Sequence, residues 1–134
     1  MSQLSHVPDQ PVPGQPAPVP REPGQAGPAE AHALARAGAA VLLDVREADE
    51  FAAGHAPGAL HQPLIALVAG VPLPPGTAGR TVLAVCRSGH RSRRAAELLA
   101  RRGVAVLNVA GGMGAWARAG LPVTTAAGDA GHVI

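Results

Sequence analysis

The chain has 134 residues, of which 47% are hydrophobic and only 1% are aromatic, and its formal net charge is +2 at pH 7. This length predicts one domain, and the scarcity of aromatic residues predicts a core of small aliphatic side chains. Binding to nucleic acid is not expected from so small a net charge. A membrane partner is not expected either, because no apolar run approaches the roughly 20 residues needed to cross a bilayer.

The N-terminal residues differ in composition from the rest of the chain. Prolines recur throughout residues 8–23, so we expect residues 1–27 to form a disordered, proline-rich leader, with a ligand for a partner domain as the alternative. The folded domain is expected at residues 28–125 and a flexible tail at residues 126–134. The leader lacks the basic and apolar regions of a signal peptide, and a cytoplasmic location is therefore expected.

Helix-forming and strand-forming segments alternate through the expected domain. In chain order we expect a helix at 29–37, a strand at 41–45, a short helix at 48–53, a short strand at 59–62, a helical turn at 64–70, a strand at 81–85, a helix at 92–102, a strand at 104–109 and a short helix at 114–119. The three longer strands are nearly all apolar, which is typical of strands buried on both faces. The alternation predicts an α/β fold, with a central parallel β-sheet flanked by helices on both faces.

Cys86 is the only cysteine, and it follows the expected strand at 81–85 directly. Ligands of open parallel sheets bind beyond the carboxyl ends of the strands. If residues 87–92 turn tightly into the next helix, a turn that Gly89 permits, their N–H groups and the positive helix end surround the thiol. Such surroundings lower the pKa of a thiol and favour the nucleophilic thiolate. The alternative is an inert buried thiol.

The spacing of Cys86 and Arg91 distinguishes two chemistries that use a thiolate in a ring of amides. The chain has the pattern C-x4-R, whereas a cysteine phosphatase needs C-x5-R to surround a tetrahedral phosphate. The shorter ring suits a single sulfur atom, which favours transfer of a sulfane sulfur through a persulfide on Cys86. A phosphatase or an arsenate reductase is the less favoured reading, and Arg87 and Arg91 are expected to attract an anionic substrate.

Three segments resemble the signatures of the rhodanese family of sulfurtransferases. Residues 86–92 (CRSGHRS) resemble its active-site loop, residues 43–59 its N-terminal signature and residues 108–123 its C-terminal signature. They keep the order of the family and cover about residues 28–125. The resemblance implies a rhodanese-like α/β domain in which Cys86 is the catalytic residue.

The resemblance also implies substrates and further site residues. A small anionic donor such as thiosulfate would load one sulfur onto Cys86, and cyanide or a thiol would remove it, with no cofactor and no metal. Substrate binding is expected of Arg87, Ser88, Gly89, His90, Arg91 and Ser92, and structural support of Asp44, Arg46 and His55.

The sequence departs from the family pattern at two places. His61 stands where members often carry asparagine, and residues 64–79 are apolar and rich in proline, so the rim of the site is expected to differ there. A second hypothesis is a carrier module, in which Cys86 passes sulfur between protein partners of a sulfur relay and turns over small donors poorly.

Overall fold

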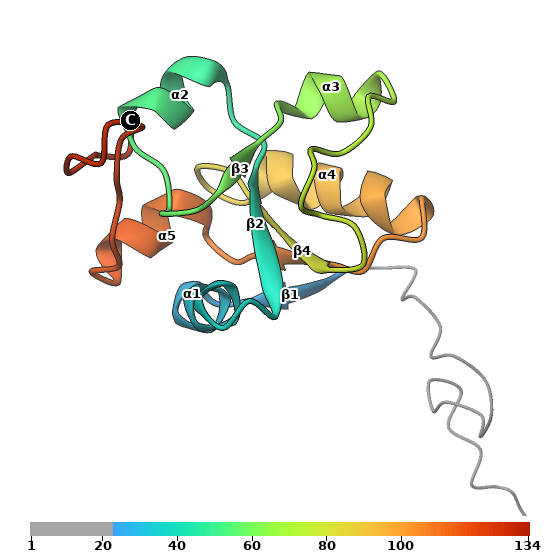
Figure 1. Ribbon diagram of the computed structural model, residues 1–134, viewed down its shortest axis with the longest axis horizontal. Helices are drawn as coiled ribbons and strands as arrows, with labels where there is room; N and C mark the ends of the chain where they lie inside the picture. The colour runs from blue at the N-terminus through green and yellow to red at the C-terminus, as the bar shows by residue number, and fades with distance from the viewer. Residues whose placement is uncertain (1–22) are drawn as a thin grey trace, which may run out of the picture.

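The computed structural model describes residues 23–134 and shows one parallel sheet with helices packed around it (Figure 1). The strands are β1 (Gly24–Ala26), β2 (Ala40–Asp44), β3 (Leu60–His61), β4 (Thr81–Val85) and β5 (Val106–Val109), in the spatial order β1-β5-β4-β2-β3. The central strand β4 pairs with β2 along its whole length, from Ala40↔Thr81 to Asp44↔Val85. The predicted α/β fold with a parallel sheet is confirmed.

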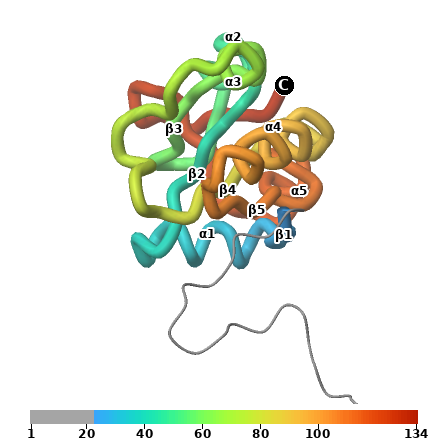
Figure 2. Tube along the Cα trace, turned by 90° about the vertical axis from the view of Figure 1, so that its right-hand side faces the viewer, coloured from blue at the N-terminus to red at the C-terminus, as the bar shows by residue number. Residues whose placement is uncertain are grey.

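Helices cover both faces of this sheet. One face packs against α1 (Pro28–Arg36) and α5 (Gly112–Arg118), and the other packs against α3 (Leu64–Val68) and α4 (His90–Arg101). Accordingly, α1 and α3 lie on opposite sides of the strands (Figure 2). The short helix α2 (Ala48–Ala53) follows β2 at the carboxyl end of the sheet.

The apolar strands divide their side chains between two cores. Leu83 and Val85 of β4 pack with α1 and α5, whereas Val82 and Ala84 pack with α3 and α4. Successive side chains of a strand point to opposite faces, so a strand covered on both sides must be apolar throughout. This is why the continuous apolar runs identified the strands correctly.

Two helices begin earlier than expected. Helix α4 begins at His90, directly after Gly89 with φ 108°, and α5 begins at Gly112, directly after Gly111 with φ 74°. Both preceding glycines adopt the left-handed region, which other residues rarely occupy. The chain can therefore turn sharply from a strand into a helix at both places.

The N-terminal boundary of the folded part differs from the expected one. Residues 24–26, expected to belong to a disordered leader, form β1 and pair in parallel with β5, from Gly24↔Leu107 to Ala26↔Val109. The strand is held by backbone pairing at the sheet edge and carries no apolar pattern that the sequence could reveal. Most of the expected leader, residues 1–22, lies outside the described residues.

The C-terminal residues also differ from the flexible tail that was expected. The His132 N–H donates to the Ala53 carbonyl at 3.1 Å, and the Gly131 N–H donates to the Val123 carbonyl at 2.9 Å. Val133 packs against the core cluster beneath α1 and α5. The end of the chain is therefore fixed beside α2. Between residues 23 and 134, no helix is long and apolar enough to cross a membrane.

Candidate active site

The Cys86 sulfur lies in a ring of hydrogen-bond donors at the end of β4. Its residue is 1% exposed, the Gly89 N–H donates to Sγ at 3.1 Å, and the Ser92 hydroxyl lies 3.3 Å from Sγ. Gly89 is the last residue before α4, so the start of that helix faces the sulfur. The end of β4, the turn and the start of α4 therefore surround the thiol.

These surroundings change the pKa of the Cys86 thiol in two directions. Burial raises the pKa, because the thiolate loses hydration. Hydrogen bonds from the Ser92 hydroxyl and from the backbone of Ser92, Gly89 and Ser88 lower it. The hydrogen bonds prevail, and the pKa of Cys86 lies below its ordinary value, which favours the reactive thiolate.

Helix α5 holds the backbone at the start of the same loop through two hydrogen bonds. The Met113 N–H donates to the Cys86 carbonyl at 2.7 Å, and the Gly114 N–H donates to the Arg87 carbonyl at 2.9 Å. This contact requires glycine at position 112, where φ is 61° and a Cβ would overlap the Cys86 carbonyl oxygen. The C-terminal signature of the sequence therefore has a physical role, which is to fix the backbone that carries the sulfur.

A buried polar chain leads from the sulfur to β5. The Ser92 Oγ lies 2.6 Å from the Asn108 side-chain oxygen, and both residues are buried. A serine hydroxyl has one proton, so it cannot donate to Asn108 and to the sulfur together. The Asn108 oxygen and the Cys86 sulfur therefore compete for this one proton, and a stronger acceptor at position 108 would draw it away from the sulfur. The sequence analysis missed Asn108, although a polar residue within an apolar buried strand is a usable signal.

The replacement Asn108→Asp is expected to raise the pKa of Cys86. An ionised carboxylate only accepts hydrogen bonds, so it takes the Ser92 proton from the sulfur and adds a negative charge nearby. The pH dependence of iodoacetamide alkylation measures this pKa directly, since Cys86 is the only cysteine. Ser92→Ala, which removes the hydroxyl itself, should shift the profile in the same direction. An unchanged profile in both variants would contradict this role for the chain of hydrogen bonds.

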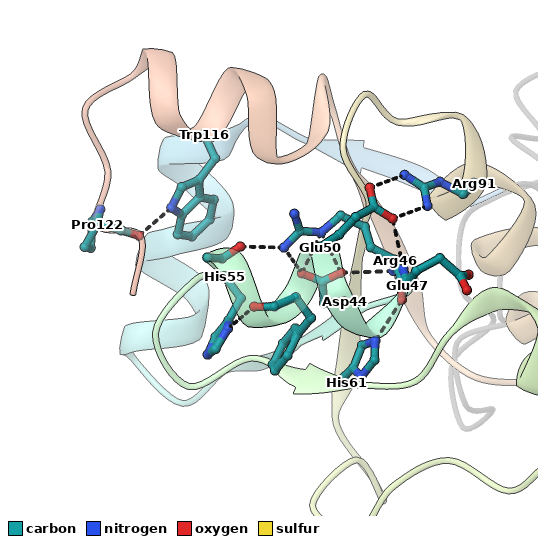
Figure 3. A network of polar contacts seen from close by, with 11 residues as sticks. Asp44, Arg46, Glu47, Glu50, His55, His61, Arg91, Trp116 and Pro122 are labelled. Atoms are coloured by element: carbon teal, nitrogen blue, oxygen red, sulfur yellow. Dashed lines mark hydrogen bonds and ion pairs between the residues drawn. The ribbon is translucent and has the colours of Figure 1, made fainter. Parts of the chain in front are cut away.

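Arg91 faces a carboxylate, which differs from the substrate-binding role predicted for it. Its Nη1 and Nη2 donate to the two Glu50 carboxylate oxygens at 2.6 and 2.8 Å (Figure 3). The hydrogen bond from Arg91 lowers the pKa of Glu50 to about 2, and the pKa of Arg91 rises in turn. The pair joins the beginning of α4 to α2 across 41 residues of sequence. The positive charge of Arg91 is therefore neutralised within the protein by Glu50.

The Glu50–Arg91 pair predicts a pH dependence of stability. The pKa of Glu50 is lowered from 4.5 to about 2 in the folded state, so the pair stabilises the fold above pH 4.5, and this contribution is lost as the pH falls toward 2. Arg91 is 36% exposed, which limits the contribution to about 1 kcal/mol. Glu50→Gln should therefore reduce the difference in unfolding free energy between about pH 6 and about pH 3, as urea titrations would measure. An equal difference in both proteins would contradict this account.

Asp44 and Arg46 form a second ion pair, which is fully buried. The Arg46 Nη2 donates to an Asp44 carboxylate oxygen at 2.7 Å and to the Gly54 carbonyl at 2.7 Å, and neither charged side chain is exposed (Figure 3). The pair links the end of β2 to the turn after α2. Its geometry is that of an anchor between these segments.

Two histidines, His55 and His61, stack on the ring of Phe51. The ring of His55 stacks on Phe51 at 3.8 Å and its Nδ1 lies 2.7 Å from the Phe51 carbonyl oxygen, while His61 stacks at 4.5 Å. The Nε2 of His61 lies 2.7 Å from the Arg46 carbonyl oxygen, so this departure from the family pattern retains a polar contact. His90 lies on the exposed side of the loop, with its Nδ1 3.1 Å from the Ser88 hydroxyl.

Among residues 23–134, no three histidine, cysteine, aspartate or glutamate side chains gather in a way that could hold a metal ion.

Residues 27–119 match the rhodanese-like domain, which spans well over half of the chain. The chain belongs to the rhodanese family. A sulfurtransferase from the bacterium Allochromatium vinosum is 39% identical over 89 residues, which make up 66% of this chain and 81% of that protein. The resemblance that the sequence motifs indicated is confirmed.

Solved structures agree with this rhodanese assignment. A rhodanese-related protein from Thermoplasma volcanium superposes with a TM-score of 0.66 at 25% identity, covering 75% of this chain and 97% of that one. A protein from Rhodopseudomonas palustris, described as a possible tyrosine phosphatase, has a TM-score of 0.65 at 29% identity, covering 75% and 84%. The rhodanese fold is thus shared with a protein for which a different reaction was suggested.

Proposed function

We propose that this rhodanese is a sulfurtransferase that moves a sulfane sulfur from thiosulfate or a similar donor to cyanide or a thiol, through a persulfide on Cys86. The observation that carries the proposal is the Cys86 sulfur, held by the Gly89 N–H and the Ser92 hydroxyl at the start of α4. The relative from Allochromatium vinosum, named a sulfurtransferase, supports the reaction class. An unpaired thiol suits a reducing compartment such as the cytoplasm.

The loop geometry supports a two-step reaction. The Cys86 thiolate attacks the outer sulfur of thiosulfate, the S–S bond of thiosulfate breaks, and its electron pair leaves with sulfite. Cyanide then attacks the terminal sulfur of the persulfide, thiocyanate departs, and the electron pair of the broken S–S bond returns to Cys86. The Gly89 N–H and the Ser92 hydroxyl stabilise the Cys86 thiolate before the attack and again after discharge of the persulfide, when the negative charge rests on Sγ.

The phosphatase alternative is disfavoured by the ion pair at Arg91. A phosphatase of this kind needs its loop arginine free to hold two phosphate oxygens, a bidentate contact that guanidinium groups make well. Here both terminal nitrogens of Arg91 already bind Glu50. The short C-x4-R spacing points in the same direction, because it reduces the ring of amides around the sulfur.

A comparison of substrates on the wild-type protein tests the proposal. With thiosulfate and cyanide we expect steady formation of thiocyanate, and with an aryl phosphate we expect no release of phosphate. Hydrolysis of the aryl phosphate without formation of thiocyanate would overturn the assignment in favour of a phosphatase. If thiosulfate is not turned over but a cysteine desulfurase loads Cys86 with sulfur, the carrier hypothesis replaces the enzymatic one.

A further inference from the structure

Two arginines beside the active-site loop have charges that the protein does not balance. Among residues 23–134, ion pairs join Arg46 to Asp44 and Arg91 to Glu50, whereas Arg87 and Arg118 form none. Arg87 directly follows the nucleophile Cys86, and Arg118 is the last residue of α5. Other arginines of residues 23–134 also form no ion pair, so what distinguishes Arg87 and Arg118 is their position beside the active-site loop.

These two arginines share one cleft. A cavity of about 200 Å³ is lined by Arg87 and Ser88 of the loop and by Gly111, Gly114 and Arg118. A Cβ at Gly114 would lie 3.2 Å from the Arg118 Nη1 and 3.3 Å from the Arg87 carbonyl oxygen. The Arg118 guanidinium therefore folds back over Gly114 toward the loop, and the glycine leaves room for it there.

We propose that this cleft binds a carboxylate of the sulfur acceptor, and that the acceptor is a small thiol whose carboxylate lies several bonds from its sulfur. The inference rests on the proposed function. The Arg118 guanidinium over a small cleft that Arg87 also lines suits the charge and the bidentate hydrogen bonding of a carboxylate. The cleft begins one residue from Cys86, which leaves the ring around the sulfur free for the transferred atom.

Transfer of the sulfur to the bound acceptor conserves atoms and electrons. The acceptor thiolate attacks the terminal sulfur of the Cys86 persulfide, a new S–S bond forms to the acceptor, and the S–S bond to Cys86 breaks. The electron pair of that bond stays on Cys86, which returns to its thiolate form. Thiosulfate carries its charge next to the transferred sulfur, so loading of Cys86 from thiosulfate does not need the cleft.

The experiment compares two acceptors that differ in charge. Cys86 is first loaded with sulfur from thiosulfate, and intact-mass measurements then follow the loss of that sulfur to glutathione or to the diethyl ester of glutathione. Arg118→Gln should slow discharge to glutathione about tenfold and leave discharge to the ester unchanged. Arg118→Lys, which keeps the charge, should recover part of the rate. Arg101→Gln, an exposed change in the last turn of α4, is the control and should behave as the wild type.

The outcomes separate this inference from the function on which it rests. Equal effects of Arg118→Gln on both acceptors, or no effect on either, would contradict binding of the acceptor carboxylate in the cleft. The proposed sulfurtransferase activity would be unaffected by either result. Failure of the wild-type protein to load sulfur on Cys86 would refute the proposed function and the inference with it.

Discussion

The replacement Cys86→Ser is expected to reduce formation of thiocyanate from thiosulfate and cyanide to the uncatalysed background. A serine hydroxyl stays protonated in the same ring of donors, and its oxygen cannot form a persulfide. No other thiol can take over, because the chain has one cysteine. A colorimetric assay for thiocyanate measures the loss.

The controls for this prediction separate chemistry from folding. Serine has nearly the shape of cysteine, so the unfolding free energy should fall by only about 1–2 kcal/mol despite the burial of Cys86. Arg94→Ala, on an exposed turn of α4, should retain wild-type activity. Turnover by a folded Cys86→Ser protein would contradict a mechanism through this sulfur.

The replacement Arg46→Ala should lower the unfolding free energy by about 3–5 kcal/mol, the largest effect on stability that we predict. It leaves the Asp44 carboxylate buried without its partner and removes the donor to the Gly54 carbonyl. Such a loss is a large part of the stability of a domain of this size. Urea unfolding of both proteins measures it.

The partly exposed Glu50–Arg91 pair provides a control for the buried Asp44–Arg46 pair. Arg91→Ala should cost about 1 kcal/mol or less, because water solvates the released Glu50. The double variant Asp44→Leu/Arg46→Met should lose less than Arg46→Ala alone, since no charge is then left buried. Similar losses in Arg46→Ala and Arg91→Ala would contradict the assignment of Arg46 as a buried anchor.

The features that could be predicted from the sequence are those encoded by neighbouring residues. Strand β4, Cys86, Gly89 and α4 follow one another within a few residues. An apolar run, a thiol, a flexible residue and a helical pattern therefore predicted their order, although α4 begins two residues earlier than expected. Both faces of β4 are buried, which gave the continuous apolar run that indicates a parallel sheet.

The features that were missed depend on contacts between distant segments. The Arg91–Glu50 pair spans 41 residues and the Ser92–Asn108 contact spans 16 residues, and no local pattern specifies either partner. Strand β1 is three residues long and depends on pairing with β5 at the edge of the sheet. The first of these contacts neutralises the charge of Arg91, and none of the three could be recognised before the segments were placed together.

The most direct test of the central claim is the intact mass of the protein after incubation with thiosulfate and removal of the excess. We expect the mass to increase by one sulfur atom, the addition to map to Cys86 in peptide fragments, and cyanide to reverse it. Cys86→Ser should show no increase under the same conditions. An unchanged mass of the wild-type protein, or an equal increase in Cys86→Ser, would contradict the persulfide on Cys86.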